Sequence, residues 1–378
     1  GNDCILSGVK KLPPAHSLII KKGCSPSLEC YWDLGQHFRN KRKFASEAEA
    51  VDALNGLIED AVQLRLISDV PLGAFLSGGI DSSLIVALMQ KVSTSPVKTF
   101  TIGFDDKQYD ESPWARQVAK YIGTEHQEIV TTPREAKEII PSLPEVYDEP
   151  FGDSSAIPTC LISRLMRTKV KVALSGDGGD EQFAGYVRYW SSNSMVKWLE
   201  RIPGFLRKNI LKCMRKIPSN AVEKCYIPAM RMLPQRLQTS NFQKHWHDMV
   251  TISPDFSKGD IYRLFVSLWS KVEIQSLISR DLHHGRYDDL FETTQHLPLL
   301  SRLMAIDQLT YLPDAMLTKT DRASMAVGLE IRVPFLDHKI VTLSTNIDEK
   351  LKYRDGRGKY VLRQLLSRYL PQRLFERP

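Results

Sequence analysis

The chain has 378 residues, of which 42% are hydrophobic and 25% are charged, and its formal net charge is +7. This length and composition allow a buried core for one large or two modest domains. No apolar run approaches the roughly 18 residues of a membrane span, and residues 1–4 do not resemble a signal peptide. The six cysteines are scattered without a CxxC pair, which is typical of free thiols in a reducing compartment. We therefore expect a cytoplasmic protein with no membrane partner.

The first part of the chain predicts a small strand-rich segment followed by a helix. Residues 1–33 contain short strand-like pieces. Ser46 and Glu49 have the spacing of a capping box, which marks the start of a helix. The apolar residues that follow recur at helical spacing on one face, at Val51, Leu54, Ile58 and Val62.

Strands and helices then alternate. Apolar, β-branched segments predict strands over residues 73–76, 99–103, 127–130 and 170–174. Helical patterns lie between them, including residues 82–90 and residues 112–121, the latter preceded by the capping acids Asp110 and Glu111. This alternation predicts an α/β fold in which helices flank a parallel sheet, with ligands bound at the carboxyl ends of the strands.

The first glycine loop, residues 77–82, reads Ser-Gly-Gly-Ile-Asp-Ser and joins a predicted strand to a predicted helix. Free amides, a positive helix N-terminus and backbone without Cβ atoms favour phosphate binding at such a junction. The loop lacks the Gly-Lys-Ser/Thr ending of a Walker A motif and carries Asp81, which suits a hard cation. A single loop of this kind is also a common structural turn, so the prediction depends on a second one.

The second glycine loop, residues 175–181, reads Ser-Gly-Asp-Gly-Gly-Asp-Glu and follows another predicted strand. Acids this close repel one another unless a cation neutralises them. Asp81 from the first loop and Asp180 from the second could therefore hold one Mg²⁺ against the phosphates of a nucleotide.

A basic helical insertion is predicted over residues 190–285. Residues 191–250 contain 11 lysines and arginines against three acids, so the rest of the chain is close to neutral. No recognised nucleic-acid motif accompanies this charge, and we expect no nucleic-acid partner. A helical part is predicted for the C-terminal region.

Together, the two glycine loops and residues 321–337 resemble glutamine-dependent asparagine synthetase, in its C-terminal synthetase domain. This domain is a member of the N-type ATP pyrophosphatases, which include β-lactam synthetase. Residues 148–158 and 358–363 also match, and the resemblance covers about residues 44–378. It implies a fold like that of the adenine nucleotide alpha hydrolases.

The resemblance implies ATP-dependent amide formation with ATP and Mg²⁺ as cofactors. ATP would adenylate the side-chain carboxylate of aspartate and release pyrophosphate, and ammonia would displace AMP to give asparagine. Two alternatives stay open at this point. The same adenylation could act on a different carboxylate, as in β-lactam synthetase or in amidotransferases of sugar acids. The chain could also be a catalytically silent ATP-binding homologue.

The resemblance also implies roles for individual residues, several of which have structural alternatives. Leu76, Ile102 and Gly176 would contact adenine and ribose, but they could equally be core positions. Asp314 would be catalytic or a helix cap, and Glu330 and Arg332 would be substrate ligands or a buried ion pair. The full prediction is ATP binding by Leu76, Ser77, Gly78, Gly79, Asp81, Ser82, Ile102, Ser175 and Gly176, catalysis by Asp177, Asp314 and Lys359, and metal binding by Asp81 and Asp180.

The ends of the chain depart from the family pattern. The family's glutaminase domain uses an N-terminal cysteine nucleophile, whereas residue 1 is Gly and Cys4 lies in a segment that resembles the tail and linker of that domain, residues 1–33. We therefore expect ammonia from glutamine hydrolysed by a partner domain or subunit. The family also has a lysine downstream of the position of Pro378, for which Lys359 is not assumed to substitute. Homodimerisation is left open.

Overall fold

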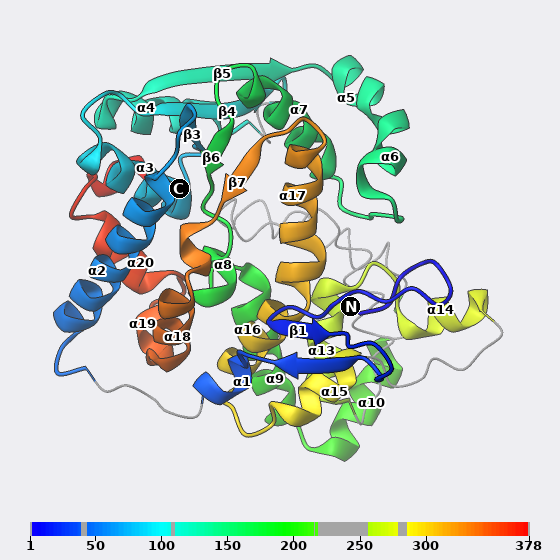
Figure 1. Cartoon of the computed structure of the whole chain (residues 1–378). Coiled ribbons are helices and arrows are strands. Elements are labelled where there is room, and N and C mark those ends of the chain that lie inside the picture. Colours follow the sequence, from blue (N-terminus) through cyan, green and yellow to red (C-terminus); the bar gives the residue numbers. More distant parts are fainter. Residues whose placement is uncertain are drawn as a thin grey trace. The chain divides into compact units, whose positions relative to one another are not determined.

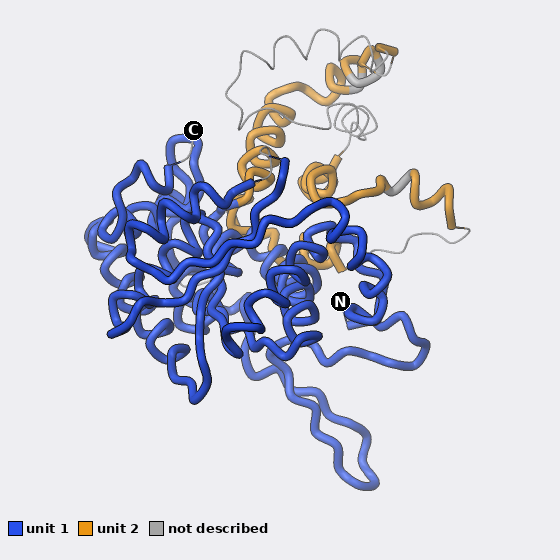
Figure 2. The backbone as a smooth tube through the Cα atoms, turned by 90° about the horizontal axis from the view of Figure 1, so that it is seen from above, with its two compact units in different colours: residues 1–185, 304–377 blue, residues 186–303, 378 orange. Residues whose placement is uncertain are grey.

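The computed structural model describes residues 2–38, 44–106, 110–214, 216–217, 256–278 and 286–376 (Figure 1). The chain falls into two compact units, residues 1–185 with 304–377, and residues 186–303 with 378 (Figure 2). The insertion predicted over residues 190–285 lies in the second unit, and its residues 215, 218–255 and 279–285 lie outside the described part.

The first unit contains a parallel sheet, as the sequence predicts, and this sheet has five strands (Figure 1). In chain order these are β3 (Leu72–Phe75), β4 (Lys98–Phe104), β5 (Glu125–Thr131), β6 (Val172–Leu174) and β7 (Glu330–Arg332). The spatial order is β5-β4-β3-β6-β7. The register places Gly73 between Lys98 of β4 and Ala173 of β6. The sequence prediction missed β7.

The strand order reverses between β3 and β6. From β3 the chain moves outward through β4 to β5, and then returns through α7 (Ala156–Arg167) to form β6 on the opposite side of β3. In open parallel sheets, such a reversal leaves a crevice at the carboxyl ends of the two strands, where ligands bind. The two glycine loops leave β3 and β6 at this point.

Helices pack on both faces of the sheet. Successive residues of a strand point to opposite faces, and both faces of these strands carry apolar side chains that helices cover. Ala74, Leu76 and Leu174 belong to one apolar core together with residues of α2 (Glu47–Leu66), α3 (Ile80–Val92) and α20 (Tyr360–Leu366). Phe75 and Ala173 face the other core, with residues of α7. The glycine loops are thus anchored in a doubly covered sheet.

The remaining elements surround the sheet or lie in the second unit. The N-terminal segment has an antiparallel hairpin of β1 (His16–Ile19) and β2 (Ser27–Cys30). The other helices of the first unit are α1 (Leu34–His37), α4 (Ser112–Ile122), α5 (Pro133–Ile139), η1 (Ile140–Ser142), α6 (Leu143–Tyr147), α8 (Gly179–Gln182), η3 (Leu312–Leu317), α17 (Thr318–Met325), η4 (Pro334–Leu336), α18 (His338–Asn346), α19 (Glu349–Lys352) and η5 (Gln372–Leu374). The second unit has α9 (Val187–Glu200), α10 (Gly204–Met214), α13 (Lys258–Val266), α14 (Lys271–Leu277) and α15 (Arg286–Thr293), and α16 (Leu299–Leu309) crosses the boundary in sequence.

Two helix starts differ from the predicted caps. The Ser46 hydroxyl accepts from the amide of Glu49 at 3.1 Å, but the Glu49 carboxylate accepts from Ala45 instead of completing the box. Before α4, Asp110 accepts from the amide of Ser112 at 3.0 Å, whereas Glu111 makes no side-chain cap bond.

In the described ranges, no helix combines the length and the apolar composition that a membrane span requires.

Candidate functional site

The two glycine loops touch each other, and glycines make this approach possible. A Cβ atom on Gly176 would lie 2.8 Å from the amide nitrogen of Ser82. A Cβ atom on Gly179 would lie 2.7 Å from one carboxylate oxygen of Asp81. Real Cβ atoms do not come this close to other atoms, so any larger residue would push the loops apart. The loops therefore form one site at the reversal point of the sheet.

The first loop is shaped to present hydroxyls and amides at the start of α3. Gly78 has φ 71° and packs directly against the backbone of Trp114 and Ala115, so a side chain there would be both strained and blocked. The hydroxyls of Ser77 and Ser82 lie 3.0 Å apart, and the Gly79 amide donates to the Ser77 hydroxyl. The N-terminus of a helix of this length carries partial positive charge and amides without intrahelical acceptors, which suit an anion.

Lys359 lies between the two acids that the sequence assigns to a metal. Its ammonium is 2.5 Å from the Asp81 carboxylate and 2.7 Å from the Asp180 carboxylate. We call this arrangement of Asp81, Lys359 and Asp180 the lysine bridge. The side chains of Asp81 and Lys359 are only 11% and 13% exposed, whereas that of Asp180 is 33% exposed, so the pair with Asp81 is the more shielded.

Two members of the lysine bridge, Asp81 and Lys359, have shifted pKa values. Burial raises the pKa of Asp81 to about 6, although Lys359 opposes this shift. Burial lowers the pKa of Lys359, but the charges of Asp81 and Asp180 outweigh it, so that pKa lies above its usual value. Lys359 is therefore charged at neutral pH and supplies positive charge at the carboxyl edge of the sheet.

The two acids fit a hard cation such as Mg²⁺. The Oδ1 atom of Asp81 is buried and has no hydrogen-bond partner in the described structure, so this oxygen is available to a ligand. No cluster of three or more metal-binding side chains occurs within the described ranges. Mg²⁺ does not need one, because it is commonly held by one or two carboxylates together with substrate phosphates and water. Asp81 and Asp180 could supply those carboxylates.

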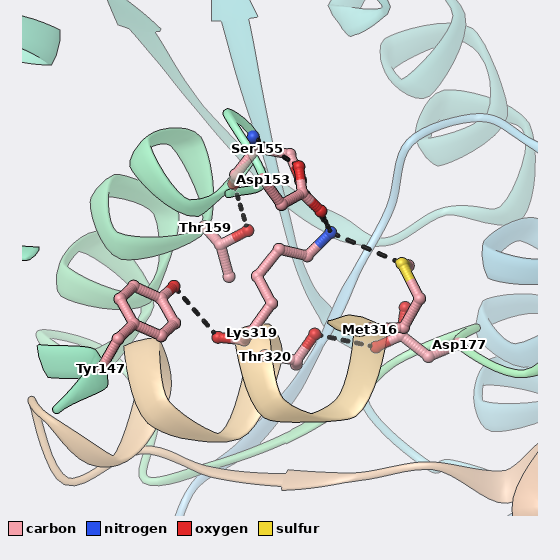
Figure 3. Close-up of polar contacts among 8 residues, drawn as sticks. All are labelled: Tyr147, Asp153, Ser155, Thr159, Asp177, Met316, Lys319 and Thr320. Carbon is pink, nitrogen blue, oxygen red and sulfur yellow. Dashed lines mark hydrogen bonds and ion pairs between the residues drawn. The ribbon is translucent and has the colours of Figure 1, made fainter. Parts of the chain in front are cut away.

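Asp177 lies in the second loop with its carboxylate turned to α17 (Figure 3). Its Oδ2 atom accepts from the hydroxyls of Ser175 at 3.0 Å and Thr320 at 3.3 Å. Burial raises the pKa of Asp177, against the effect of these hydroxyls and of the nearby Lys319 charge. A carboxylate with a raised pKa is a better proton acceptor, which suits the catalytic role predicted for it.

A second buried lysine, Lys319, which the sequence prediction missed, lies on α17 next to Thr320 (Figure 3). The Lys319 ammonium lies 2.7 Å from the Ser155 hydroxyl and 3.3 Å from the Asp153 carboxylate. Its side chain is 9% exposed, and its backbone carbonyl accepts from the Tyr147 hydroxyl. Asp153 lies in the matched motif 148–158, but nothing in the sequence indicates its contact with a residue 166 positions away.

Two other predicted residues, Leu76 and Ile102, lie in or against the apolar cores of the sheet. Leu76 is a core residue whose amide donates to Phe100 of β4 at 2.9 Å, and Ile102 packs against the second core. Asp314 is exposed on the π-helix η3, whose N-cap is Tyr311 with no side-chain cap bond. The catalytic role of Asp314 and the nucleotide contacts of Leu76 and Ile102 stay predictions.

The alternative of a buried Glu330–Arg332 ion pair is wrong. The two charges do lie 2.7 Å apart, but the Glu330 side chain is 56% exposed because it stands at the start of the edge strand β7. Arg332 also donates to the carbonyls of Arg65 at 2.8 Å and Ile67 at 2.7 Å. It therefore caps the C-terminal end of α2, where the last carbonyls lack intrahelical donors.

A cavity of about 380 Å³ has Thr320 in its wall, the same residue whose hydroxyl donates to Asp177. It lies where η3 and α17 face the carboxyl end of β7. Its walls combine apolar side chains with hydroxyls and one acid, from Pro313, Leu317, Thr318, Thr320, Asp321, Ile331 and Val333.

Comparisons with known proteins match the chain to one family. Residues 53–378 match the family model of asparagine synthase. Asparagine synthetase (glutamine-hydrolyzing) 1 of Bacillus subtilis (strain 168) is 28% identical over 381 residues, which cover 98% of this chain and 54% of the relative. The putative asparagine synthetase (glutamine-hydrolyzing) 2 of Methanocaldococcus jannaschii is 33% identical over 308 residues, covering 81% of this chain and 54% of the relative.

The chain thus spans about half the length of these curated relatives. Among solved structures, NMN synthetase from Francisella tularensis matches 68% of this chain and 98% of its own, with a TM-score of 0.29 and 13% identity. The fold assignment rests on the strand order of the sheet and on the family match.

Proposed function

The chain belongs to the asparagine synthase family, and on that premise we propose that it adenylates the side-chain carboxylate of aspartate with ATP and converts it to the amide of asparagine. Membership of the family supports an ATP-dependent amide-forming ligase as the general activity. Aspartate as the acceptor and ammonia from a glutaminase domain or subunit are the finer parts of the proposal.

The single observation that carries the proposal is the contact of the two glycine loops at the reversal point of the sheet. A nucleotide triphosphate needs donors for its phosphates and positive charge for the pyrophosphate that leaves. The Ser77 and Ser82 hydroxyls and the start of α3 offer the donors, and Lys359 offers the charge. Mg²⁺ held by Asp81 and Asp180 would add positive charge to the leaving pyrophosphate.

The reaction would proceed in two displacements. In the first, a carboxylate oxygen of the acid bonds to the α-phosphorus, and the bond from this phosphorus to the bridging oxygen breaks to release pyrophosphate. In the second, ammonia bonds to the activated carbon and AMP leaves with its bonding electrons. Asp177 would take the proton that the attacking nitrogen loses, a role that its pKa, raised by burial, supports.

The acceptor acid would occupy the cavity lined by Thr320, whose hydroxyl also donates to Asp177. The Thr318 and Thr320 hydroxyls and the Asp321 carboxylate of this cavity could bind the polar groups of an amino acid. The apolar lining, which includes Ile331 and Val333, would restrict the size of the acceptor. A different acceptor carboxylate would have to fit the same cavity. Comparing the rates for several acids therefore tests which acceptor the chain uses.

The test is release of pyrophosphate from ATP and Mg²⁺, with ammonia as nitrogen donor and with aspartate compared against sugar acids and N-substituted amino acids. We expect aspartate to give the highest rate. Asp81→Asn and Asp180→Asn should abolish Mg²⁺-dependent release, whereas Asp60→Asn, which changes an exposed acid on α2, should retain it. Nucleotide binding without release from any acid would identify a silent homologue. Wild-type rates in both site variants would refute the metal assignment.

A further inference from the structure

Lys359 occupies the place between two acids that a divalent cation would take. Its ammonium contacts Asp81 from the first glycine loop and Asp180 from the second, at 2.5 and 2.7 Å. These acids are 99 positions apart in the sequence and come from loops that follow different strands. One ammonium therefore links the two halves of the candidate nucleotide site.

The backbone around Lys359 is built to hold it there. Lys359 has φ 58°, a left-handed conformation that is unfavourable for a residue with a side chain. Its amide donates to the carbonyl of Phe183 at 2.8 Å, which ties the start of α20 to the end of α8. Ala184 is also left-handed, with φ 56°. Strain of this kind persists only where the surrounding contacts enforce it.

Two glycines allow this close approach. A Cβ atom on Gly185 would lie 1.9 Å from the Asp180 carboxylate and 2.2 Å from the Lys359 side chain. A Cβ atom on Gly358 would lie 2.0 Å from the carbonyl oxygen of Ala184. Packed backbone on both sides thus restricts the Lys359 side chain, which does not rotate freely as a surface lysine would.

The electrostatics explain why the site needs a cation before any ligand arrives. Two carboxylates brought together in a largely buried place repel each other and lose hydration, unless a positive charge pairs with them. Lys359 satisfies part of this need. The Oδ1 atom of Asp81 still has no partner in the described structure, so the coordination of the acids is incomplete.

We propose that Lys359 is a built-in counter-ion, which holds the two glycine loops together in the nucleotide-free chain and gives up its place to the divalent cation when the nucleotide binds. This rests on the proposed function in one respect, that the cation is the one that accompanies ATP. Because the ammonium and the metal compete for the same carboxylates, each weakens the binding of the other. The metal therefore binds poorly until phosphates add their own ligands. After a short displacement the ammonium would then contact those phosphates.

The competition can be measured without turnover. Mn²⁺, which prefers the same oxygen ligands, is titrated into the nucleotide-free chain, and free Mn²⁺ is followed by electron paramagnetic resonance. Lys359→Met keeps the apolar stem and removes the charge. We expect it to bind Mn²⁺ about tenfold more tightly than the wild type or better, within the usual range of coupling between sites. Adding Asp81→Asn to this variant should abolish the gain. Affinity no greater than that of the wild type in a folded Lys359→Met protein would overturn the proposal.

Lys319→Met is the matched control, because Lys319 is a similarly buried lysine paired with a carboxylate outside the lysine bridge. It should leave Mn²⁺ affinity unchanged, and a gain equal to that of Lys359→Met would mean that any lost lysine charge has this effect. Circular dichroism tests whether both variants fold.

A second measurement uses the wild type alone, and so does not depend on a variant folding. Acetylation of Lys359 by acetic anhydride, quantified by mass spectrometry, should be slow in the metal-free chain. It should be faster, without nucleotide, at a Mn²⁺ concentration that the titration shows to saturate the site. An acetylation rate that Mn²⁺ does not change would contradict displacement. Neither measurement requires turnover. The counter-ion role of Lys359 can therefore hold even if no acid gives pyrophosphate release. Equally, pyrophosphate release can occur even if the counter-ion role is wrong.

Discussion

Replacing Gly358 by alanine should destabilise the fold at the lysine bridge. The new Cβ atom would lie 2.0 Å from the Ala184 carbonyl oxygen, whereas carbon and oxygen approach to only about 3.3 Å even in weak hydrogen bonds. The blocking atom belongs to the backbone, so the conflict cannot be relieved by a change of rotamer. Overpacking of this kind costs about 1–3 kcal/mol. The lower entropy of alanine in the unfolded chain offsets about 0.4–1 kcal/mol of it.

The two terms leave a net loss of between about 0 and 2.6 kcal/mol, and we expect Gly358→Ala to lower the free energy of unfolding by about 1–2 kcal/mol, the middle of this range. Urea denaturation should show a lower midpoint with an unchanged slope. Gly56→Ala is the control, because Gly56 is an exposed glycine within α2 where a Cβ atom would meet nothing within 4 Å. It should raise the midpoint by the equivalent of about 0.5–1 kcal/mol. A Gly358→Ala midpoint at or above that of the wild type would refute the packing argument.

Two further predictions concern the acids that face α17. Asp177→Asn keeps an oxygen that can accept from Ser175 and Thr320 but removes the proton acceptor, so turnover should fall by about 100-fold or more, and unchanged turnover would exclude Asp177 as the base. Burial raises the pKa of Asp153, but Ser155 and Lys319 outweigh burial and hold this pKa below its usual value. The ionised acid therefore stabilises the fold at neutral pH. This stabilisation is lost as the pH falls through the folded-state pKa. Asp153→Asn should therefore lower the unfolding free energy at neutral pH by about 1–2 kcal/mol, with a difference from the wild type that shrinks in acid, and a difference that is constant with pH would contradict this assignment.

Local rules of the chain account for the parts of the site that could be predicted. A strand followed by Gly-rich sequence and a helix is a pattern over about ten residues, and each glycine loop satisfies it independently. The α2 face of Val51, Leu54, Ile58 and Val62 is likewise a repeat along one helix, and these four residues are buried. Because parallel strands end at the same edge, the two loops could be expected to meet.

Other features depended on partners distant in sequence. The strand β7 has only three residues with a charge at each end, and it becomes a strand because Ile331 pairs opposite Ala173 of β6. Arg332 carries no sequence signal for a cap, since the carbonyls that it binds belong to a helix 267 and 265 positions earlier. The partnership of Lys319 with Asp153 was missed for the same reason.

The amino-acid sequence by itself determined the alternation of strands and helices and the two glycine loops at strand ends, because periodicity and conformational preference act between neighbouring residues. Only the tertiary structure decided that an ammonium stands between Asp81 and Asp180, since Lys359 comes to Asp81 from 278 positions away. That placement depends on two left-handed residues and two glycines packed without space for a Cβ atom. Such a fit results from the packing of distant segments, which no local pattern encodes.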